Sequence, residues 1–235
     1  MRLNKFLSET GMCSRREADS LITQGRVSLN GKRAELGSQV TEADEVRVDN
    51  RVVGGRAKKQ KVYICLNKPV GITCTTERHI KDNIIDFIGH EERIFPIGRL
   101  DKESSGLILL TNNGDIVNEI LRSENNHEKE YWVTVDHAVT DAFLVNMARG
   151  VHILNTKTKP CKISRVGKHD FRIILTQGLN RQIRRMCEVF GYTVCRLQRI
   201  RIVNIKLGGL KVGRWRKLTD SELRGLLPGF SQNLG

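Results

Sequence analysis

The chain has 235 residues, of which 39% are hydrophobic and 28% are charged, as in a water-soluble globular protein of one or two domains. No apolar run approaches the length of a membrane span, and the first residues lack the apolar core of a signal peptide. The 40 Lys and Arg against 26 Asp and Glu give a formal net charge of +14, which predicts a polyanionic partner, most often nucleic acid.

The positive charge is concentrated in three blocks. Residues 1–33 carry seven basic and three acidic side chains, residues 51–61 carry five and none, and residues 161–217 carry fifteen and two. The segments between these blocks are acidic, and this uneven placement is more typical of a binding track than of uniform solvation.

The six cysteines form no CxxC pair, and none has a Cys or His neighbour at zinc-binding spacing. Several lie in apolar patterns, where a cysteine acts as a small hydrophobic side chain. We therefore expect a reduced, cytoplasmic protein without a metal site.

Residues 1–50 predict two helices followed by a small curled sheet. The first helix, over residues 2–9, has Leu3, Phe6 and Leu7 on one face, and a capping box at Ser14 opens the second. Asn30-Gly31 is a strong signal for a two-residue hairpin turn. Four basic residues are expected on the outer helix faces: Arg2, Lys5, Arg15 and Arg16.

This segment resembles the S4 RNA-binding domain. The resemblance rests on Arg2-Leu3-Asn4-Lys5-Phe6-Leu7, Ser14-Arg15-Arg16-Glu17-Ala18, residues 25–31 and residues 44–48. It implies that the basic helical face lies against structured RNA. An amphipathic helical hairpin with a solvated charged face is the alternative, and it explains the whole pattern poorly.

Residues 51–61 contain a glycine pair and five basic residues without apolar periodicity, which predicts a flexible basic linker. Beyond it, strand patterns alternate irregularly with helix patterns, so residues 62–228 are expected to form an α+β domain with a long mixed or antiparallel sheet flanked by helices. The helix expected over 115–122 has Ile116, Ile120 and Leu121 inward. Residues 229–235 are expected to form a disordered tail.

The segment Gly98-Arg99-Leu100-Asp101, followed by Lys102-Glu103-Ser104-Ser105-Gly106, places one carboxylate on a polar loop before an apolar strand. A lone Asp in a loop is usually a turn residue or an ion-pair partner. Here, however, the segment resembles the catalytic motif of the pseudouridine synthases. Three more segments resemble motifs of that family in the expected order, namely Asn67-Lys68-Pro69-Val70-Gly71, Lys129-Glu130-Tyr131, and residues 178–186 with Leu197 and Arg199 downstream.

The resemblance is to the pseudouridine synthases with an N-terminal S4 domain, in the branch that acts on ribosomal RNA. It implies isomerisation of uridine in structured RNA by a monomer that needs neither cofactor nor metal. The expected substrate is 23S ribosomal RNA, with a tRNA as a second one. It assigns Asp101 as the nucleophile on a flipped-out nucleotide, attacking either the base or the sugar. Tyr131 would stack on the uracil and take part in proton transfer, and Arg184 would form an ion pair with Asp101.

Further basic residues are assigned to RNA. Arg181 and Arg185 are expected to contact phosphates, Arg199 to lie on the RNA track, and Arg99 to fill the gap left by the flipped nucleotide. A salt bridge to a neighbouring acid is nearly as good an explanation for Arg99, and Trp215, amid basic residues, could stack on RNA or pack in the core.

Three other functions are weighed against parts of the chain. A non-catalytic RNA-binding factor would explain the charge and residues 1–50, but not the Asp101, Tyr131 and Arg184 segments. A glycoside hydrolase would need a second carboxylate, for which Glu103 is the candidate. A nuclease would need a metal site, for which the sequence offers no Asp/His cluster.

Overall fold

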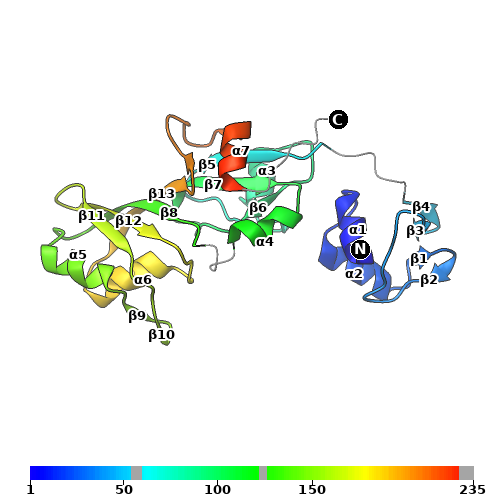
Figure 1. Ribbon diagram of the computed structural model, residues 1–235, viewed down its shortest axis with the longest axis horizontal. Coiled ribbons are helices and arrows are strands. Elements are labelled where there is room, and N and C mark those ends of the chain that lie inside the picture. Colours follow the sequence, from blue (N-terminus) through cyan, green and yellow to red (C-terminus); the bar gives the residue numbers. More distant parts are fainter. Residues whose placement is uncertain (54–59, 122–125, 228–235) are drawn as a thin grey trace. The chain divides into compact units, whose positions relative to one another are not determined.

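The computed structural model describes residues 1–53, 60–121 and 126–227. The chain divides into two units, Met1–Lys61 and Val62–Gly235, each built from its own elements (Figure 1). None of the helices in the described part of the chain combines the length and the apolar character that crossing a bilayer requires.

The smaller unit begins with two helices, α1 (Leu3–Glu9) and α2 (Arg15–Thr23), as the apolar spacing predicted. Ser14 caps α2, because its hydroxyl accepts the Glu17 N–H at 3.1 Å while the Glu17 carboxylate accepts the Ser14 N–H. This capping box satisfies two of the N–H groups that a first helical turn leaves unpaired. The helices bury the side chains of Leu3, Leu7, Ala18 and Ile22.

Four short strands complete the smaller unit in the order β2 (Lys32–Arg33), β1 (Val27–Leu29), β3 (Val46–Val48) and β4 (Arg51–Val52). Asn30 and Gly31 join β1 to β2 with φ angles of 51° and 77°. Two successive left-handed residues form the turn that matches the twist of a hairpin, so the Asn-Gly signal is confirmed.

The predicted linker over 51–61 is wrong at its first three residues. Arg51 and Val52 pair with β3, and the Val53 N–H donates to the Val46 carbonyl at 2.8 Å while the Val53 side chain joins the core. Because β4 is an exposed edge strand of two residues, its sequence shows no apolar alternation. Residues 54–59 of the predicted linker, and the predicted tail over 229–235, lie outside the described residues.

In the larger unit, nine strands form one sheet with the order β11-β12-β8-β13-β7-β5-β15, to which β14 and β6 add at β13 and β7. The β13–β7 pair is parallel and the other pairs are antiparallel, so the mixed sheet that the sequence predicted is confirmed. The strands are β5 (Tyr63–Lys68), β6 (Phe95–Ile97), β7 (Ser105–Thr111), β8 (Lys129–Val135), β11 (Lys162–Arg165), β12 (Asp170–Leu175), β13 (Val194–Ile202), β14 (Ile205–Lys206) and β15 (Trp215–Lys217). A separate hairpin pairs β9 (His152–Ile153) with β10 (Thr156–Lys157).

The helices of the larger unit cover different parts of the sheet (Figure 1). Helices α5 (Asp141–Ala148) and α6 (Gln182–Val189) pack on β8, β12 and β13, whereas α3 (Ile84–Ile88) packs against apolar residues of β5 and β7. Helices α4 (Asp115–Leu121) and α7 (Asp220–Leu226) pack on the other face of β5 and β7. Ile116 and Ile120 of α4 are buried as predicted, but Leu121 is 38% exposed and the prediction that it points inward is wrong.

The strand register places four residues side by side in a row across the sheet. Lys68 of β5 pairs with Gly106 of β7, Gly106 with Arg199 of β13, and Arg199 with Tyr131 of β8. Paired residues project to the same face, so the row shares one face of the sheet. Gly106 is required here, because its φ is +102° and a Cβ atom would lie 2.2 Å from the Arg199 carbonyl oxygen.

Candidate active site

Asp101 lies on the loop that joins β6 to β7, four residues before Ser105, where β7 begins. Leu100, the residue before it, is buried and its N–H donates to the Cys74 Sγ at 3.4 Å. The Asp101 carbonyl accepts the Ser104 N–H at 3.0 Å, which closes a turn. The Asp101 side chain is partly exposed. The loop therefore holds a carboxylate at the edge of the core, anchored on both sides and reachable from solvent.

Lys68 is fully buried, and its ammonium is near enough to the Asp101 carboxylate for the two charges to interact. Its Nζ donates to the carbonyl oxygens of Pro69 and Ile72 at 2.9 and 2.8 Å, so it closes the loop that follows β5. The Gly71 N–H in that loop donates to the Lys102 carbonyl at 2.8 Å. Burial lowers the pKa of the Lys68 ammonium, and the nearby Cys74 thiol and Asp101 carboxylate oppose this shift. The Gly71–Lys102 hydrogen bond thus connects the loop that Lys68 closes to the loop of Asp101.

Lys68 belongs to the motif Asn67-Lys68-Pro69-Val70-Gly71, from which no role for its side chain was predicted. A signal was present, because Ile64, Leu66 and Lys68 alternate along one strand and therefore share a face. The first two are buried, so the third was placed to be buried as well.

Tyr131 of β8 lies at the end of the row opposite Lys68, and its partly buried ring packs against two core clusters. Lys129 lies two residues before Tyr131 on the same strand, so the two side chains project to the same face. Burial and the positive charge of Arg199 lower the pKa of the Lys129 ammonium. Tyr131 and Lys129 thus lie on the sheet face that also carries Lys68 and Arg199.

Arg199 was expected on an exposed RNA track, and this prediction is wrong for the described structure. Its side chain is 4% exposed, and its Nε donates to the Leu107 carbonyl at 2.7 Å. The reason is its position in the row, where Tyr131 and Gly106 flank it on the neighbouring strands. Its Nη2 is buried without a hydrogen-bond partner among the described residues.

Arg184 of α6 points to the Asp101 loop, but it does not form the predicted ion pair. Its Nη2 donates to the Glu103 carbonyl and the Ser104 hydroxyl, both at 3.4 Å, and its Nη1 donates to the Val194 carbonyl at 3.1 Å. Within the described ranges, no salt bridge joins Arg184 to Asp101. The guanidinium is 9% exposed and is directed to the turn that follows Asp101, so its side chain supports that loop.

Glu103 is paired with Arg181, whose Nη1 lies 2.8 Å from the Glu103 Oε2. The hydrogen bond from Arg181 lowers the pKa of the Glu103 carboxyl. A glycosidase general acid instead needs a carboxyl whose pKa is raised. The lowered pKa of Glu103 is therefore the opposite of what the glycoside hydrolase alternative requires.

Two more residues of the larger unit, Arg99 and Arg185, were predicted to contact RNA, and they differ in their hydrogen-bond partners. Arg99 is exposed on the Asp101 loop. Arg185 donates to the carbonyl and side-chain oxygens of Asn180 at 3.1 and 3.2 Å, so it braces the turn before α6. Among residues 1–53, 60–121 and 126–227, no three His, Cys, Asp or Glu side chains gather closely enough to hold a metal ion.

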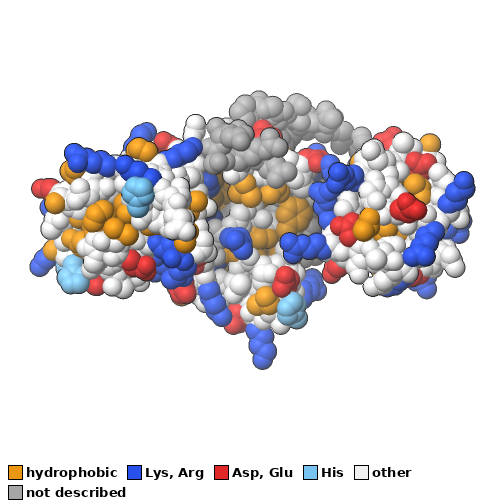
Figure 2. All heavy atoms as spheres, turned by 90° about the horizontal axis from the view of Figure 1, so that it is seen from below, with side chains coloured by type: hydrophobic (Ala, Val, Ile, Leu, Met, Phe, Trp, Pro, Cys, Tyr) orange, Lys and Arg blue, Asp and Glu red, His pale blue; other side chains and the backbone are white. Residues whose placement is uncertain are grey.

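In the smaller unit, Arg2, Arg15 and Arg16 are exposed, whereas Lys5 forms an ion pair with Glu9 at 3.5 Å. Lys and Arg side chains are distributed over the visible surface of both units, with Asp and Glu among them (Figure 2). The predicted exposure of Arg2, Arg15 and Arg16 is confirmed, and their contact with RNA stays a prediction.

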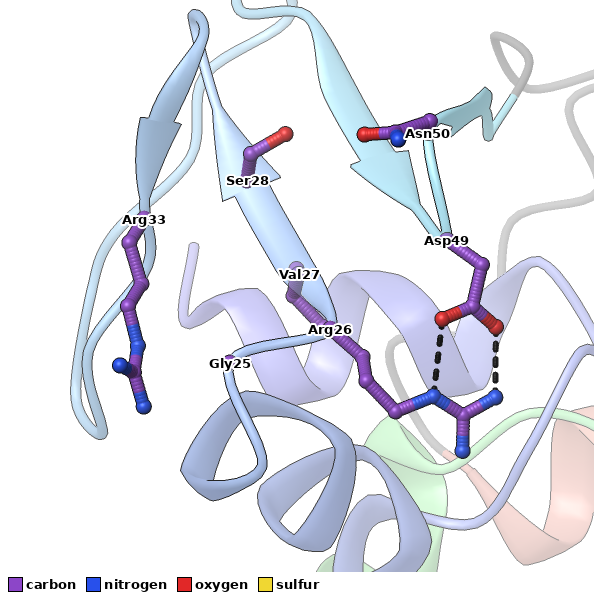
Figure 3. A pocket seen from close by; sticks show the side chains of 7 residues that line it. All are labelled: Gly25, Arg26, Val27, Ser28, Arg33, Asp49 and Asn50. Carbon is purple, nitrogen blue, oxygen red and sulfur yellow. Dashed lines mark hydrogen bonds and ion pairs between the residues drawn. The ribbon is translucent and has the colours of Figure 1, made fainter.

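The sequence analysis did not single out a pocket of about 330 Å³ beside β1 in the smaller unit. On one side of it, the Arg26 guanidinium holds the Asp49 carboxylate through two hydrogen bonds of 2.8 and 2.5 Å (Figure 3). On the other side, Arg33 donates to the Thr23 carbonyl at 3.2 Å. Arg26 follows a helix-ending glycine and Arg33 lies on a hairpin strand, so local patterns indicated a turn and not a pocket.

Comparison with known proteins gives concordant matches. The model of the RNA pseudouridylate synthase family matches residues 62–189, and the S4 domain model matches residues 1–46. The dual-specificity RNA pseudouridine synthase RluF of Salmonella typhi is 59% identical over 222 residues, which cover 94% of this chain and 77% of the relative. Ribosomal large subunit pseudouridine synthase B of Bacillus subtilis (strain 168) is 36% identical over 234 residues, which cover 96% and 95%.

Among solved structures, a crystal structure of a pseudouridylate synthase matches with a TM-score of 0.69 at 28% identity, covering 97% of this chain and 100% of that one. The segment matched by the synthase family contains Asp101, Tyr131 and Arg184. The resemblance inferred from the motifs is confirmed by these matches. The chain therefore belongs to the RNA pseudouridylate synthase family and carries an S4 domain over its first 46 residues.

Proposed function

We propose that this protein converts particular uridines to pseudouridine in 23S ribosomal RNA and in a tRNA of related shape, with Asp101 as the nucleophile. Membership of the family gives the reaction class, uridine isomerisation in RNA. The narrower choice of substrate is supported by two relatives, one named for a dual specificity and one for the large ribosomal subunit.

The observation that carries the proposal is the position of Asp101. Its carboxylate is partly exposed on an anchored loop, and its charge acts on Lys68, which shares a row with Gly106, Arg199 and Tyr131. A nucleophilic carboxylate must be reachable by the nucleotide and held in a fixed direction, and this loop meets both requirements.

The reaction breaks the bond between uracil N1 and the sugar C1′ and forms a bond between C5 and C1′. Asp101 forms a transient covalent bond to the nucleotide while the uracil turns, and that bond breaks when the product forms. C5 loses its proton and N1 gains one, so atoms and electrons balance without an oxidant, a reductant or water. The isomerisation therefore requires no cofactor.

Tyr131 borders the space where the uracil would lie. Its ring is partly exposed, so one side can stack on a base that has left its helix. Its hydroxyl is then placed to move the proton that C5 releases. Arg99, exposed on the same loop as Asp101, would fill the gap that the everted nucleotide leaves in the RNA.

Arg184 contributes by positioning. It holds the Glu103 carbonyl and the Ser104 hydroxyl, so it fixes the turn directly after Asp101 and places a positive charge behind it. Arg181 and Arg185 begin the same helix region and lie toward solvent, where phosphates can reach them.

The smaller unit, with Arg2, Arg15 and Arg16 exposed, would dock a structured part of the RNA and leave the chemistry to residues 62–228. We extend the proposal to a monomer acting in the cytoplasm, where ribosomal and transfer RNA are found. Light scattering at micromolar concentration tests whether the protein is a monomer, because a monomer has a mass near 26.7 kDa.

Release of tritium from RNA labelled at C5 of uridine tests the function directly. Wild-type protein should release tritium from a 23S ribosomal RNA transcript, and Asp101→Asn should release it at least about 10³-fold more slowly. Asp101→Asn should still bind the same transcript with a Kd within twofold of wild type, because it removes no positive charge. Glu103→Gln is the matched control and should keep most of the activity.

Undiminished release by Asp101→Asn would refute the nucleophile. Wild-type protein that binds RNA but releases no tritium would favour the non-catalytic RNA-binding alternative. Mapping pseudouridines in ribosomal and transfer RNA from cells with and without the protein would then identify the modified positions.

A further inference from the structure

An exposed aromatic surface lies at the edge of the large sheet, outside the site described above. Trp215 of β15 is 39% exposed and Phe87 of α3 is 40% exposed. The rings of His90 and Trp215 lie 5.6 Å apart with a 54° tilt. A Cβ atom on Gly213 would lie 3.5 Å from the Phe87 ring, so the turn before β15 lies against Phe87. We call Phe87, His90 and Trp215 the Trp215 platform.

The strand register places the Trp215 platform on the same face of the sheet as the Asp101 site. Trp215 pairs with Leu66 of β5, and paired residues share a face. Lys68 lies two residues beyond Leu66 and therefore also on that face, where it pairs with Gly106 at the start of β7.

The platform also lies at the same end of the sheet. The Asn67 N–H donates to the Arg214 carbonyl at 3.0 Å, and the Gly213 N–H donates to the Asn67 carbonyl at 2.8 Å. The start of β15 is thus beside the end of β5, where the Asp101 loop begins its contacts with Gly71. One strand separates β15 from β7, which corresponds to a lateral distance of about 10 Å.

Three cations surround the platform without a counter-charge. Lys211, Arg214 and Lys217 are exposed, and none of them forms an ion pair with any residue in the described ranges. Arg216, between them, has both guanidinium ends held by the Glu222 carboxylate at 2.7 Å. The unpaired charges therefore lie close to Trp215 in the chain, and Lys217 shares its sheet face, whereas the charge of Arg216 is neutralised.

We propose that the Trp215 platform stacks on an unpaired base of the RNA substrate close to the uridine held at Asp101, and that Lys211, Arg214 and Lys217 contact the adjoining phosphates. An exposed aromatic ring beside unneutralised Lys and Arg is the arrangement by which proteins bind single-stranded nucleic acid. Full core packing is excluded as the role of Trp215, because more than a third of its surface is open. The inference rests on the proposed function for the identity of the RNA.

The test compares Trp215→Ala with Trp215→Phe, which keeps a stacking ring. The control is Val145→Ala, which shortens an exposed apolar side chain on α5, away from the platform. Filter binding to a 23S ribosomal RNA transcript gives Kd, and tritium release from the labelled transcript gives KM and kcat. We expect Trp215→Ala to raise Kd and KM about tenfold, as the loss of one base–aromatic stack does, with kcat within twofold.

Trp215→Phe should recover Kd to within about threefold, and Val145→Ala should match wild type. An unchanged Kd for Trp215→Ala would overturn the proposal. So would equal weakening by Ala and Phe together with a lowered Tm, which would indicate a structural role. A fall in molecular mass on light scattering with Trp215→Ala, at unchanged Kd, would instead assign the platform to contact with a second copy.

The binding readout separates this inference from the proposed function. Kd does not require turnover, so a wild-type protein that releases no tritium would refute the catalytic proposal and leave the Kd comparison valid. Weakened binding by Trp215→Ala in that case would still support the platform. Intact turnover with unchanged Kd would refute the platform alone.

Discussion

The two units of this protein use the same kind of side chain in opposite ways. In the smaller unit, Arg2, Arg15 and Arg16 are exposed, whereas around Asp101 the exposed fractions of Lys68, Arg184 and Arg199 are 0%, 9% and 4%. An exposed cation can meet a phosphate, but a buried cation has to satisfy its charge inside the protein. The net charge of +14 therefore overstates the number of cations that are free to bind RNA.

The buried cations near Asp101 each donate to backbone carbonyls. Lys68 holds Pro69 and Ile72, Arg199 holds Leu107, and Arg184 holds Val194 and Glu103. Burying a charge is costly unless hydrogen bonds compensate for the lost water. These cations consequently act as supports that fix the loops around the carboxylate, and their removal should change chemistry and stability more than RNA affinity.

Gly106→Ala should have the largest effect on this support. The new Cβ would lie 2.2 Å from the Arg199 carbonyl oxygen, at a φ of +102° that a side chain rarely adopts. The backbone of β7 or β13 would have to shift, and residue 106 would be strained. We therefore expect the free energy of unfolding to fall by about 3 kcal/mol. Urea denaturation measures it. Gly178→Ala is the matched control, because a Cβ there meets nothing within 4 Å.

An unfolding midpoint for Gly106→Ala equal to that of Gly178→Ala would show that β7 and β13 do not approach each other so closely in solution. The comparison between a buried row of cations and an exposed set would then lose its structural basis.

Lys68→Met should separate positioning from binding. The variant leaves the Pro69 and Ile72 carbonyls without their donor, at a cost of about 2 kcal/mol in stability, and it frees the loop that contacts the Asp101 loop. A misplaced catalytic group can lower kcat about 10²-fold, and we expect a loss of that order in tritium release. The Kd for RNA should stay within twofold, because this charge does not reach the surface.

Lys206→Met, which removes an exposed lysine of β14 in the same sheet, is the control for Lys68→Met. It should keep the urea midpoint and kcat of wild type. A tenfold loss of RNA affinity in Lys68→Met, without loss of kcat, would contradict the positioning role.

The double variant Arg15→Ala with Arg16→Ala should show the smallest effect of the three. Its pattern is the opposite of that of Lys68→Met, because RNA affinity falls while kcat and stability are kept. Removing two exposed charges should raise Kd about tenfold near 0.1 M salt and leave kcat within twofold. If each arginine contacts one phosphate, the slope of log K against log salt should become shallower by about 1.5. An unchanged slope would mean that these arginines face solvent in the complex.

Local signals in the sequence predicted much of the fold. The capping box at Ser14 opens α2, the Asn30-Gly31 turn joins β1 to β2, and apolar spacing indicated α1. Each of these depends on residues a few positions apart, so the chain carries the information locally.

Long-range pairing could not be predicted in the same way. The edge strands β4 and β15 have only two and three residues, and each exists because a distant strand offers its hydrogen bonds. The same limit applied to Arg199, which was expected to reach RNA and is buried, and to Arg184, which was expected to pair with Asp101 and supports the next turn instead.

The sequence by itself determined the family, the reaction class and the position of the one motif-placed carboxylate, because these depend on residue types in a fixed order. Only the tertiary structure decided which cations are buried beneath that carboxylate and which remain free, and that Trp215 lies open on the same sheet face. Burial depends on which strands and helices come together, and a side chain's neighbours across a sheet are set by the register of residues that are far apart in the chain.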